Sequence, residues 1–258
     1  MMERNKIYKG DCLQLMKEMP SHSVDLILTD MPYGVLNKGN PDAQWDKEVS
    51  LPSLWSQYKR IIKPNGAILL FGQGLFAAKL IMSNPKLYRY ELIWDKVRKS
   101  NFLNCKKMPM RQHEQVLVFY KKPPTYNPQM VRCLPHQRNH SRGRMEKEPT
   151  NTCYGKFGKA EDLITDFKYP GTIVRFPKGH SKEDWLHSTA KPVNLLRWLI
   201  RTYSNEGDLV LDSFAGSGST LIAAIEEKRD FIGIEISEKF YEICQRRVDE
   251  RLRQQTLF

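Results

Sequence analysis

The chain has 258 residues, of which 40% are hydrophobic, and its formal net charge is +12. This length is sufficient for one α/β domain with an inserted subdomain. No apolar stretch approaches the roughly 18 residues that a membrane span requires, and residues 1–6 lack the apolar segment of a signal peptide. The five cysteines are scattered without a CxxC pair, which is typical of reduced thiols. We therefore expect a soluble cytoplasmic protein with no membrane partner.

The positive charge is concentrated in the middle of the chain. Residues 96–182 contain 19 Lys and Arg against 6 Asp and Glu, whereas the remainder is close to neutral. Solubility does not require such a concentration, and a surface that neutralises phosphates gains affinity from the counterions it releases. The charge distribution therefore favours a nucleic acid as the partner.

The first part of the chain alternates short apolar runs with amphipathic segments. Strands are predicted over residues 5–9, 24–28, 67–71, 90–94 and 115–120, and helices over residues 12–19, 51–62 and 75–82. Such alternation is typical of a mostly parallel sheet with helices on both faces.

From residue 121 to about 182 this pattern stops, because seven prolines and many basic residues interrupt any periodicity. This stretch is predicted to be an irregular insert. Regular elements return as helices over 193–203, 219–228 and 237–254, with strands over 208–212 and 231–235. Residues 1–120 and 183–258 are therefore expected to form one domain that is interrupted by the insert at 121–182.

A glycine turn follows the strand predicted at 208–212. Gly216 and Gly218 allow the backbone to turn tightly and to approach a ligand closely. Glu235 ends the next strand, where a carboxylate can accept hydrogen bonds from ribose hydroxyls. Leu221 stands where a dinucleotide fingerprint has its third glycine. The pattern favours a cofactor with a nucleoside but no pyrophosphate, namely S-adenosylmethionine, although such a turn is also an ordinary α/β connection.

A second motif, Asp30-Met31-Pro32-Tyr33, follows the strand predicted at 24–28. An exocyclic amine on a base is a poor nucleophile because its lone pair is delocalised into the ring. The Asp30 carboxylate and the Met31 carbonyl could accept its two hydrogens and leave the lone pair facing an incoming methyl. Pro32 stiffens the turn, and Tyr33 offers a ring for an extruded base. Alone, the motif equally fits a strand-to-loop turn with a buried tyrosine.

In this order, the two motifs resemble those of the β group of amino-group DNA methyltransferases, which methylate adenine N6 or cytosine N4. The family patterns are (D/N/S)-P-P-(Y/F/W) and F-x-G-x-G, separated by a target-recognition region. Segments 10–13, 93–96 and 187–192 are also family-like, so the resemblance covers nearly all of the chain outside roughly 121–180. It implies an S-adenosylmethionine-dependent methyltransferase (Rossmann-like) fold, with a catalytic part at 1–120, a target-recognition insert at 121–182 and a cofactor-binding part at 183–258.

The resemblance also implies roles for single residues. Asp30 and Met31 would hold the target amine, with Pro32 shaping the turn and Tyr33 stacking on the base. Met31 replaces the usual first proline, a change that keeps the carbonyl but lowers the rigidity of the turn. An aspartate at position 30 favours adenine N6 as the target.

On the cofactor side, the family roles fall on eight positions. Asp11 would contact the adenine amino group, and Glu235 would bind the ribose. The methionine portion would lie near Thr189, Lys191, Phe214, Gly216 and Gly218, and Asp212 would also belong to the cofactor site.

The expected function is sequence-specific methylation of adenine N6 in double-stranded DNA, by base flipping and direct displacement. Cytosine N4, RNA methylation and a non-catalytic DNA-binding relative are the alternatives. The surplus charge would supply the phosphate contacts, and candidates for contacts with DNA are Arg132, Gln137, Arg138, Asn139, Arg142 and Arg144. A dimer is compatible with the sequence, which leaves the oligomeric state open.

Two weaker signals lie outside these motifs. Cys133, His136, His140 and Cys153 have a spacing that zinc tolerates, but their order is not a common finger pattern, so no metal is predicted. The terminal Gln254-Gln255-Thr256-Leu257-Phe258 resembles peptides that dock on the bacterial sliding clamp. The same residues could instead fold back onto the protein's own core.

Overall fold

The structure is a computed structural model that describes residues 2–34, 48–133, 166–177 and 190–255. It divides into a larger unit, Met1–Asn127 with Thr172–Phe258, and a smaller unit, Pro128–Gly171. Within the described residues, no helix has the length and apolar character needed to cross a membrane.

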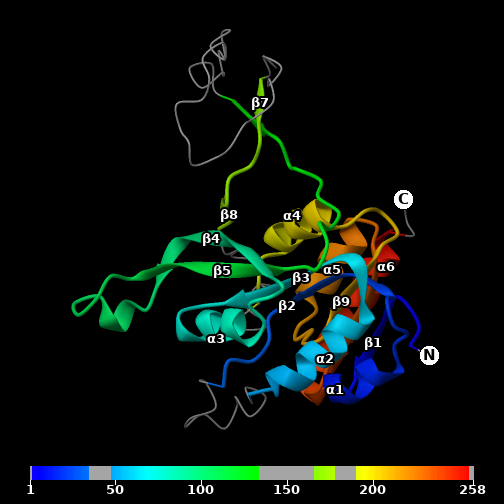
Figure 1. The fold of residues 1–258 in the computed structure, drawn as a ribbon. Coiled ribbons are helices and arrows are strands. Elements are labelled where there is room, and N and C mark those ends of the chain that lie inside the picture. Colours follow the sequence, from blue (N-terminus) through cyan, green and yellow to red (C-terminus); the bar gives the residue numbers. More distant parts are fainter. Residues whose placement is uncertain (1, 35–47, 134–165, 178–189, 256–258) are drawn as a thin grey trace. The chain divides into compact units, whose positions relative to one another are not determined.

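An eight-stranded sheet forms the centre of the larger unit in its described part (Figure 1). Its strands lie in the order β1 (Lys6–Lys9), β10 (Asp230–Glu235), β9 (Leu209–Asp212), β2 (Val24–Thr29), β3 (Ile62–Gly72), β5 (Arg111–Phe119), β4 (Tyr88–Ser100) and β8 (Ile173–Arg175). The strands from β1 to β3 are mutually parallel. β5 is antiparallel to both β3 and β4, and β8 is parallel to β4. The predicted mostly parallel sheet is therefore confirmed, with β5 as its antiparallel strand.

Helices cover both faces of this sheet, as predicted. The buried residues of α1 (Cys12–Leu15), α2 (Leu51–Ile61) and α3 (Leu75–Ser83) belong to one apolar cluster. Those of α4 (Val193–Tyr203), α5 (Ser219–Glu226) and α6 (Glu238–Gln255) belong to the other. In β2, Leu26 and Leu28 join one cluster and Ile27 the other. This alternation explains why Leu26–Leu28 of β2 is an unbroken apolar run, since a strand covered on both faces needs no polar side.

Two element boundaries differ from the prediction. β3 begins at Ile62, directly after α2, because Val24 pairs with Ile62 while Leu26 already pairs with Ala67. The residues between these pairs form a bulge, which is where a strand accommodates a proline such as Pro64. The helix predicted over residues 12–19 is α1 followed by a 3₁₀ turn, η1 (Met16–Glu18).

The smaller unit contains an antiparallel pair, β6 (Val131–Arg132) and β7 (Phe167–Lys168), in its described part. The Cys133 amide donates to the Asp166 carbonyl over 2.7 Å and extends this pair. β8 lies within the range predicted as the insert, yet it pairs with β4 in the main sheet.

The order of the strands reverses between β2 and β9. From β2 the chain passes through α2 to β3 on one side, whereas from β9 it passes through α5 to β10 on the other. The helices α2 and α5 cover opposite faces of the sheet. In doubly wound sheets, ligands bind outside the carboxyl ends of the strands at such a reversal. The fold therefore directs attention to the residues that follow β2 and β9.

Candidate active site

The carboxyl ends of the parallel strands carry the acidic residues singled out in the sequence. Asp212 and Glu235 are the last residues of β9 and β10, Asp30 follows β2, and Asp11 lies just beyond β1. The hydroxyl of Thr29, at the end of β2, donates to Asp212 Oδ1 over 2.6 Å. The two motifs that are far apart in the chain are thus neighbours at one edge of the sheet.

Asp212 is buried and its carboxylate is held by neutral donors. Besides Thr29, the Phe214 amide donates to Oδ1 over 3.1 Å, and the Thr220 hydroxyl also stabilises the charged form. Desolvation outweighs these contacts and raises the pKa of Asp212 to about 6, because neutral donors compensate a buried charge only in part.

The glycines after β9 serve different purposes. Both Gly216, with φ 52°, and Gly218, with φ 81°, adopt the left-handed conformation, which strains any residue with a Cβ. A Cβ on Gly218 would lie 2.6 Å from Cys244 Sγ of α6. A Cβ on Gly216 would meet nothing closer than the Phe214 carbonyl, at 4.0 Å. Gly218 therefore permits the packing of α6, whereas Gly216 leaves open space beside the turn.

Glu235 ties this turn to the end of β10. Its Oε2 accepts from the Gly216 amide and its Oε1 from the Ser237 amide, both over 2.8 Å. Burial outweighs these amide contacts and raises the pKa of Glu235. Each oxygen keeps a further lone pair, so the contact with ribose stays a prediction. Asp11 is exposed and caps α1 by accepting from the Gln14 amide over 3.0 Å.

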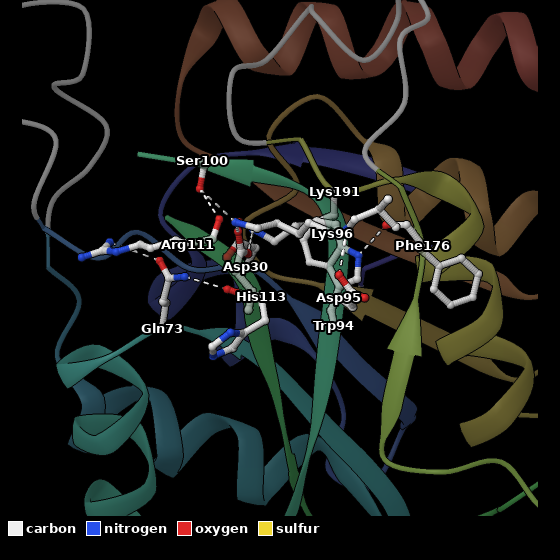
Figure 2. A network of polar contacts seen from close by, with 12 residues as sticks. Asp30, Gln73, Trp94, Asp95, Lys96, Ser100, Arg111, His113, Phe176 and Lys191 are labelled. Carbon is white, nitrogen blue, oxygen red and sulfur yellow. Dashed lines mark hydrogen bonds and ion pairs between the residues drawn. The ribbon is translucent and has the colours of Figure 1, made fainter. Parts of the chain in front are cut away.

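Asp30 lies at one end of a chain of alternating charges (Figure 2). The Lys191 ammonium is 2.5 Å from Asp30 Oδ2, and the Tyr33 hydroxyl donates to Oδ1 over 3.1 Å. Lys191 is also 3.2 Å from Glu114 Oε2, while Glu114 Oε1 is 3.2 Å from the Lys96 ammonium. Sequence reasoning placed Lys191 beside the cofactor, whereas the structure places its ammonium on Asp30.

Burial and charged neighbours shift the pKa of Asp30, Glu114 and Lys191. Burial opposes the charge on Lys191, but Asp30 and Glu114 outweigh it and raise the pKa of the ammonium. Burial opposes the charge on Glu114 too, but Lys191 and Lys96 lower the pKa of this carboxyl. For Asp30 the burial prevails over Lys191, and its pKa is raised. Lys191 also lies over the Phe71 ring, 5.0 Å from its centroid, a favourable position for a desolvated cation.

A bulge in β4 brings Lys96 to this chain of charges. Asp95 pairs with His113 and Ser100 with Arg111, so four residues of β4 stand opposite a single residue of β5. Within the bulge, Val97 has φ 64°, a conformation that costs a β-branched residue about 1–3 kcal/mol. Bulges beside active sites commonly redirect a side chain, and this one accompanies the turn of Lys96 towards Glu114.

Phe76 supports Tyr33 and was missed by sequence reasoning. The two rings stack with centroids 4.3 Å apart and an angle of 26° between their planes. Glu114 and Lys96 were missed as well. Before the fold is known, nothing distinguishes Phe76 from a core residue of α3, or Glu114 from any polar residue of a hairpin.

Several predicted residues are not tested by this geometry. Arg132 is exposed on β6, and Cys133 is buried beside it. Outside the described residues lie Thr189, His136, Gln137, Arg138, Asn139, His140, Arg142, Arg144, Cys153 and the terminal Thr256, Leu257 and Phe258. The described part of the chain contains no group of three or more His, Cys, Asp and Glu suited to a metal ion.

The fold is shared with solved methyltransferases. The crystal structure of the M1.HpyAVI–SAM complex has a TM-score of 0.63 at 21% identity, and the match covers 95% of this chain and 98% of that chain. The cytosine-N4-specific PvuII DNA methyltransferase has a TM-score of 0.67 at 15% identity, over 98% of this chain and 93% of that one. At these identities the likeness concerns the fold, which confirms the predicted methyltransferase architecture.

Sequence comparison defines the family. The N6/N4 DNA methylase family model matches residues 24–246, and the chain belongs to this family of DNA methyltransferases. The type II methyltransferase M.HinfI of Haemophilus influenzae is 29% identical over 276 residues, which cover 95% of this chain and 68% of the relative. The DNA adenine methyltransferase YhdJ of Escherichia coli K12 is 28% identical over 258 residues, covering 96% and 83% of the two chains.

Proposed function

We propose that this protein transfers a methyl group from S-adenosylmethionine to adenine N6 in double-stranded DNA. The observation that carries the proposal is Asp30, held at the end of β2 beside the glycine turn of β9 by Lys191 and Tyr33. Membership of the DNA methylase family supports the reaction class. The adenine specificity of YhdJ supports the choice of base, as does the aspartate at position 30.

The residues around the turn fit S-adenosylmethionine. Gly216 leaves open space beside the backbone, and Glu235 keeps acceptor capacity for a diol at the end of β10. The buried carboxylate of Asp212 lies next to the same turn. When bound there, the cofactor supplies a methyl group activated by a sulfonium.

Asp30 and the Met31 carbonyl would accept the two hydrogens of the target amine. A carboxylate has about four acceptor positions, so Asp30 can serve the amine while it also accepts from Lys191 and Tyr33. The ammonium of Lys191 favours the ionised form of this carboxylate and so opposes the effect of burial, which raises its pKa. In the displacement, nitrogen would take the methyl group that the sulfonium carries, and the proton that nitrogen then loses would pass to Asp30 or to water.

The test uses labelled S-adenosylmethionine and a mixed-sequence DNA duplex, followed by digestion and mass identification of the nucleosides. N6-methyladenine is the expected product, and Asp30→Ala should abolish it. Glu206→Ala, which removes an exposed carboxylate outside the site, should leave the yield unchanged. N4-methylcytosine would correct the base, and a wild-type protein that labels neither base would overturn the proposal.

A further inference from the structure

A basic arm, residues 96–111, forms the end of the β4–β5 hairpin. It contains six Lys and Arg and no acidic residue. The two strands extend beyond the helices of the larger unit, and the arm ends in a short 3₁₀ turn, η3 (Phe102–Asn104) (Figure 1). The arm contacts Glu114 and Gln73 at its base, through Lys96 and Arg111, and the basic composition of the part beyond the base points to a partner outside the chain.

The tip of the basic arm exposes two large apolar side chains. Leu103 is 93% and Phe102 72% exposed to solvent. The turn that carries them is well hydrogen-bonded: the Asn104 amide donates to the Asn101 carbonyl over 3.1 Å and the Cys105 amide to the Phe102 carbonyl over 3.0 Å. The Asn104 side chain also donates to Asn101 Oδ1 over 2.7 Å. The apolar tip is thus presented on an ordered turn, which favours contact with a partner.

The base of the arm joins the chain of charges at Asp30. Lys96, its first residue, contacts Glu114, which in turn contacts Lys191. The Ser100 hydroxyl donates to the Arg111 carbonyl over 3.1 Å and holds the two strands of the arm together (Figure 2). The arm therefore extends directly from the residues that hold the Asp30 carboxylate.

We propose that the basic arm is a DNA wedge, in which Phe102 and Leu103 enter the base stack beside the target base. Basic residues before and after the tip, among them the exposed Lys99, Lys106 and Lys107, contact the flanking phosphates. The inference rests on the proposed function, because an extruded base leaves a gap in the stack. Apolar side chains inserted at a base step are a common way to hold DNA open.

Charge distinguishes DNA from a second copy of the chain as the partner. Two arms of this kind would bring like charges together, which is unfavourable at an interface. Duplex DNA offers phosphates to the lysines and stacked bases to the apolar tip, so both features are satisfied by one partner.

The test compares two double variants on a mixed-sequence duplex. Phe102→Ser with Leu103→Ser should lower the rate of methyl transfer at saturating DNA at least tenfold, while the Kd for the duplex changes less than threefold. Lys106→Gln with Lys107→Gln should weaken the Kd and reduce the slope of log K against log salt by about 2, one for each phosphate that is no longer neutralised. Met82→Ser, which removes an exposed apolar side chain on α3, should change neither quantity.

A tip variant that methylates the duplex at the wild-type rate would overturn the wedge. The wedge would also be overturned if the wild type sediments as a dimer and the tip variant as a monomer, because the tip would then be a contact between copies. If the wild type transfers no methyl group, the proposed function fails, but the wedge is still tested with a duplex that carries 2-aminopurine in place of adenine. The wild-type protein should increase the fluorescence of 2-aminopurine by unstacking this base, and the tip variant should not.

Discussion

The two sides of the candidate site hold their carboxylates in different ways. On the cofactor side, Asp212 and Glu235 accept from backbone amides and hydroxyls alone in their described contacts, and burial raises the pKa of both. On the substrate side, Asp30 meets the ammonium of Lys191, which is itself shared with Glu114.

This difference matches the chemistry proposed for each side. A carboxylate that orients a ribose or an ammonium group needs a fixed position, which amides of the adjacent turn can provide. A carboxylate that holds a weakly nucleophilic amine must also stay ionised in a desolvated place, and this requires a cation. Four predictions test the comparison, from the largest expected effect to the smallest.

Lys191→Met should lower kcat at pH 7 by about 10³-fold. Without its ammonium, the pKa of Asp30 rises further, so a smaller fraction of the carboxyl is ionised at a given pH. Because the ionised form is required, the lost activity should return in part as the pH rises from 6 to 9. Measurement of kcat across this range checks the prediction, and Lys191→Arg should recover part of the rate. A variant whose pH profile parallels that of the wild type would contradict this role.

Glu114→Gln should lower the free energy of unfolding by about 3–4 kcal/mol, because Lys191 then keeps only Asp30 as an anionic partner and Lys96 loses the carboxylate that it contacts. Urea denaturation at neutral pH measures this loss. The double variant Glu114→Gln with Lys96→Met removes one charge of each sign and should recover most of the stability. Equal losses in the single and double variants would show that Glu114 does not balance the two lysines.

Asp212→Asn should raise the free energy of unfolding at pH 7.5 by about 2–3 kcal/mol. The folded pKa of about 6 lies above the ordinary value of 3.8. The folded protein therefore holds the proton more tightly, and the wild type loses stability as the pH rises from about 4 to 6. The asparagine oxygen still accepts from Thr29 and Phe214 but carries no charge, so this loss disappears.

Thermal unfolding between pH 4 and 8 measures the effect of Asp212→Asn, with Glu250→Gln on the exposed part of α6 as the control. Asp212→Asn should also weaken the binding of S-adenosylmethionine if Asp212 contacts the cofactor. A wild type whose stability is constant from pH 4 to 6 would contradict the raised pKa.

Gly216→Ala should cost about 1–2 kcal/mol of stability, because its left-handed conformation strains an L-residue. It should also weaken the binding of S-adenosylmethionine, since the new methyl group enters the open space of the turn. Gly207→Ala is a matched control, with φ 78° and no atom within 4 Å of the new Cβ. It should show the same loss of stability with unchanged affinity, and calorimetric titration separates the two variants.

The cofactor side was predictable from sequence because it is local. The strand, glycine turn and carboxylate lie within residues 209–235. The geometry of the strand and the conformational requirements of a tight turn limit the structures that such a segment can form. The paired strands and helices on both faces were predictable for a similar reason, since periodicity reports which faces are buried. Asp30 was found from its place after a buried strand.

The chain of charges around Asp30 was decided by the tertiary structure alone. Lys96, Glu114 and Lys191 come from a bulge in β4, from β5 and from the segment before α4. Their meeting depends on the antiparallel register of β4 with β5 and on a bulge that no composition or period indicates. The sequence by itself determined the class of fold and the residues at the strand ends, because these follow from local steric and hydrophobic patterns. Which cation holds Asp30 depended on side chains that approach only when the whole sheet is assembled.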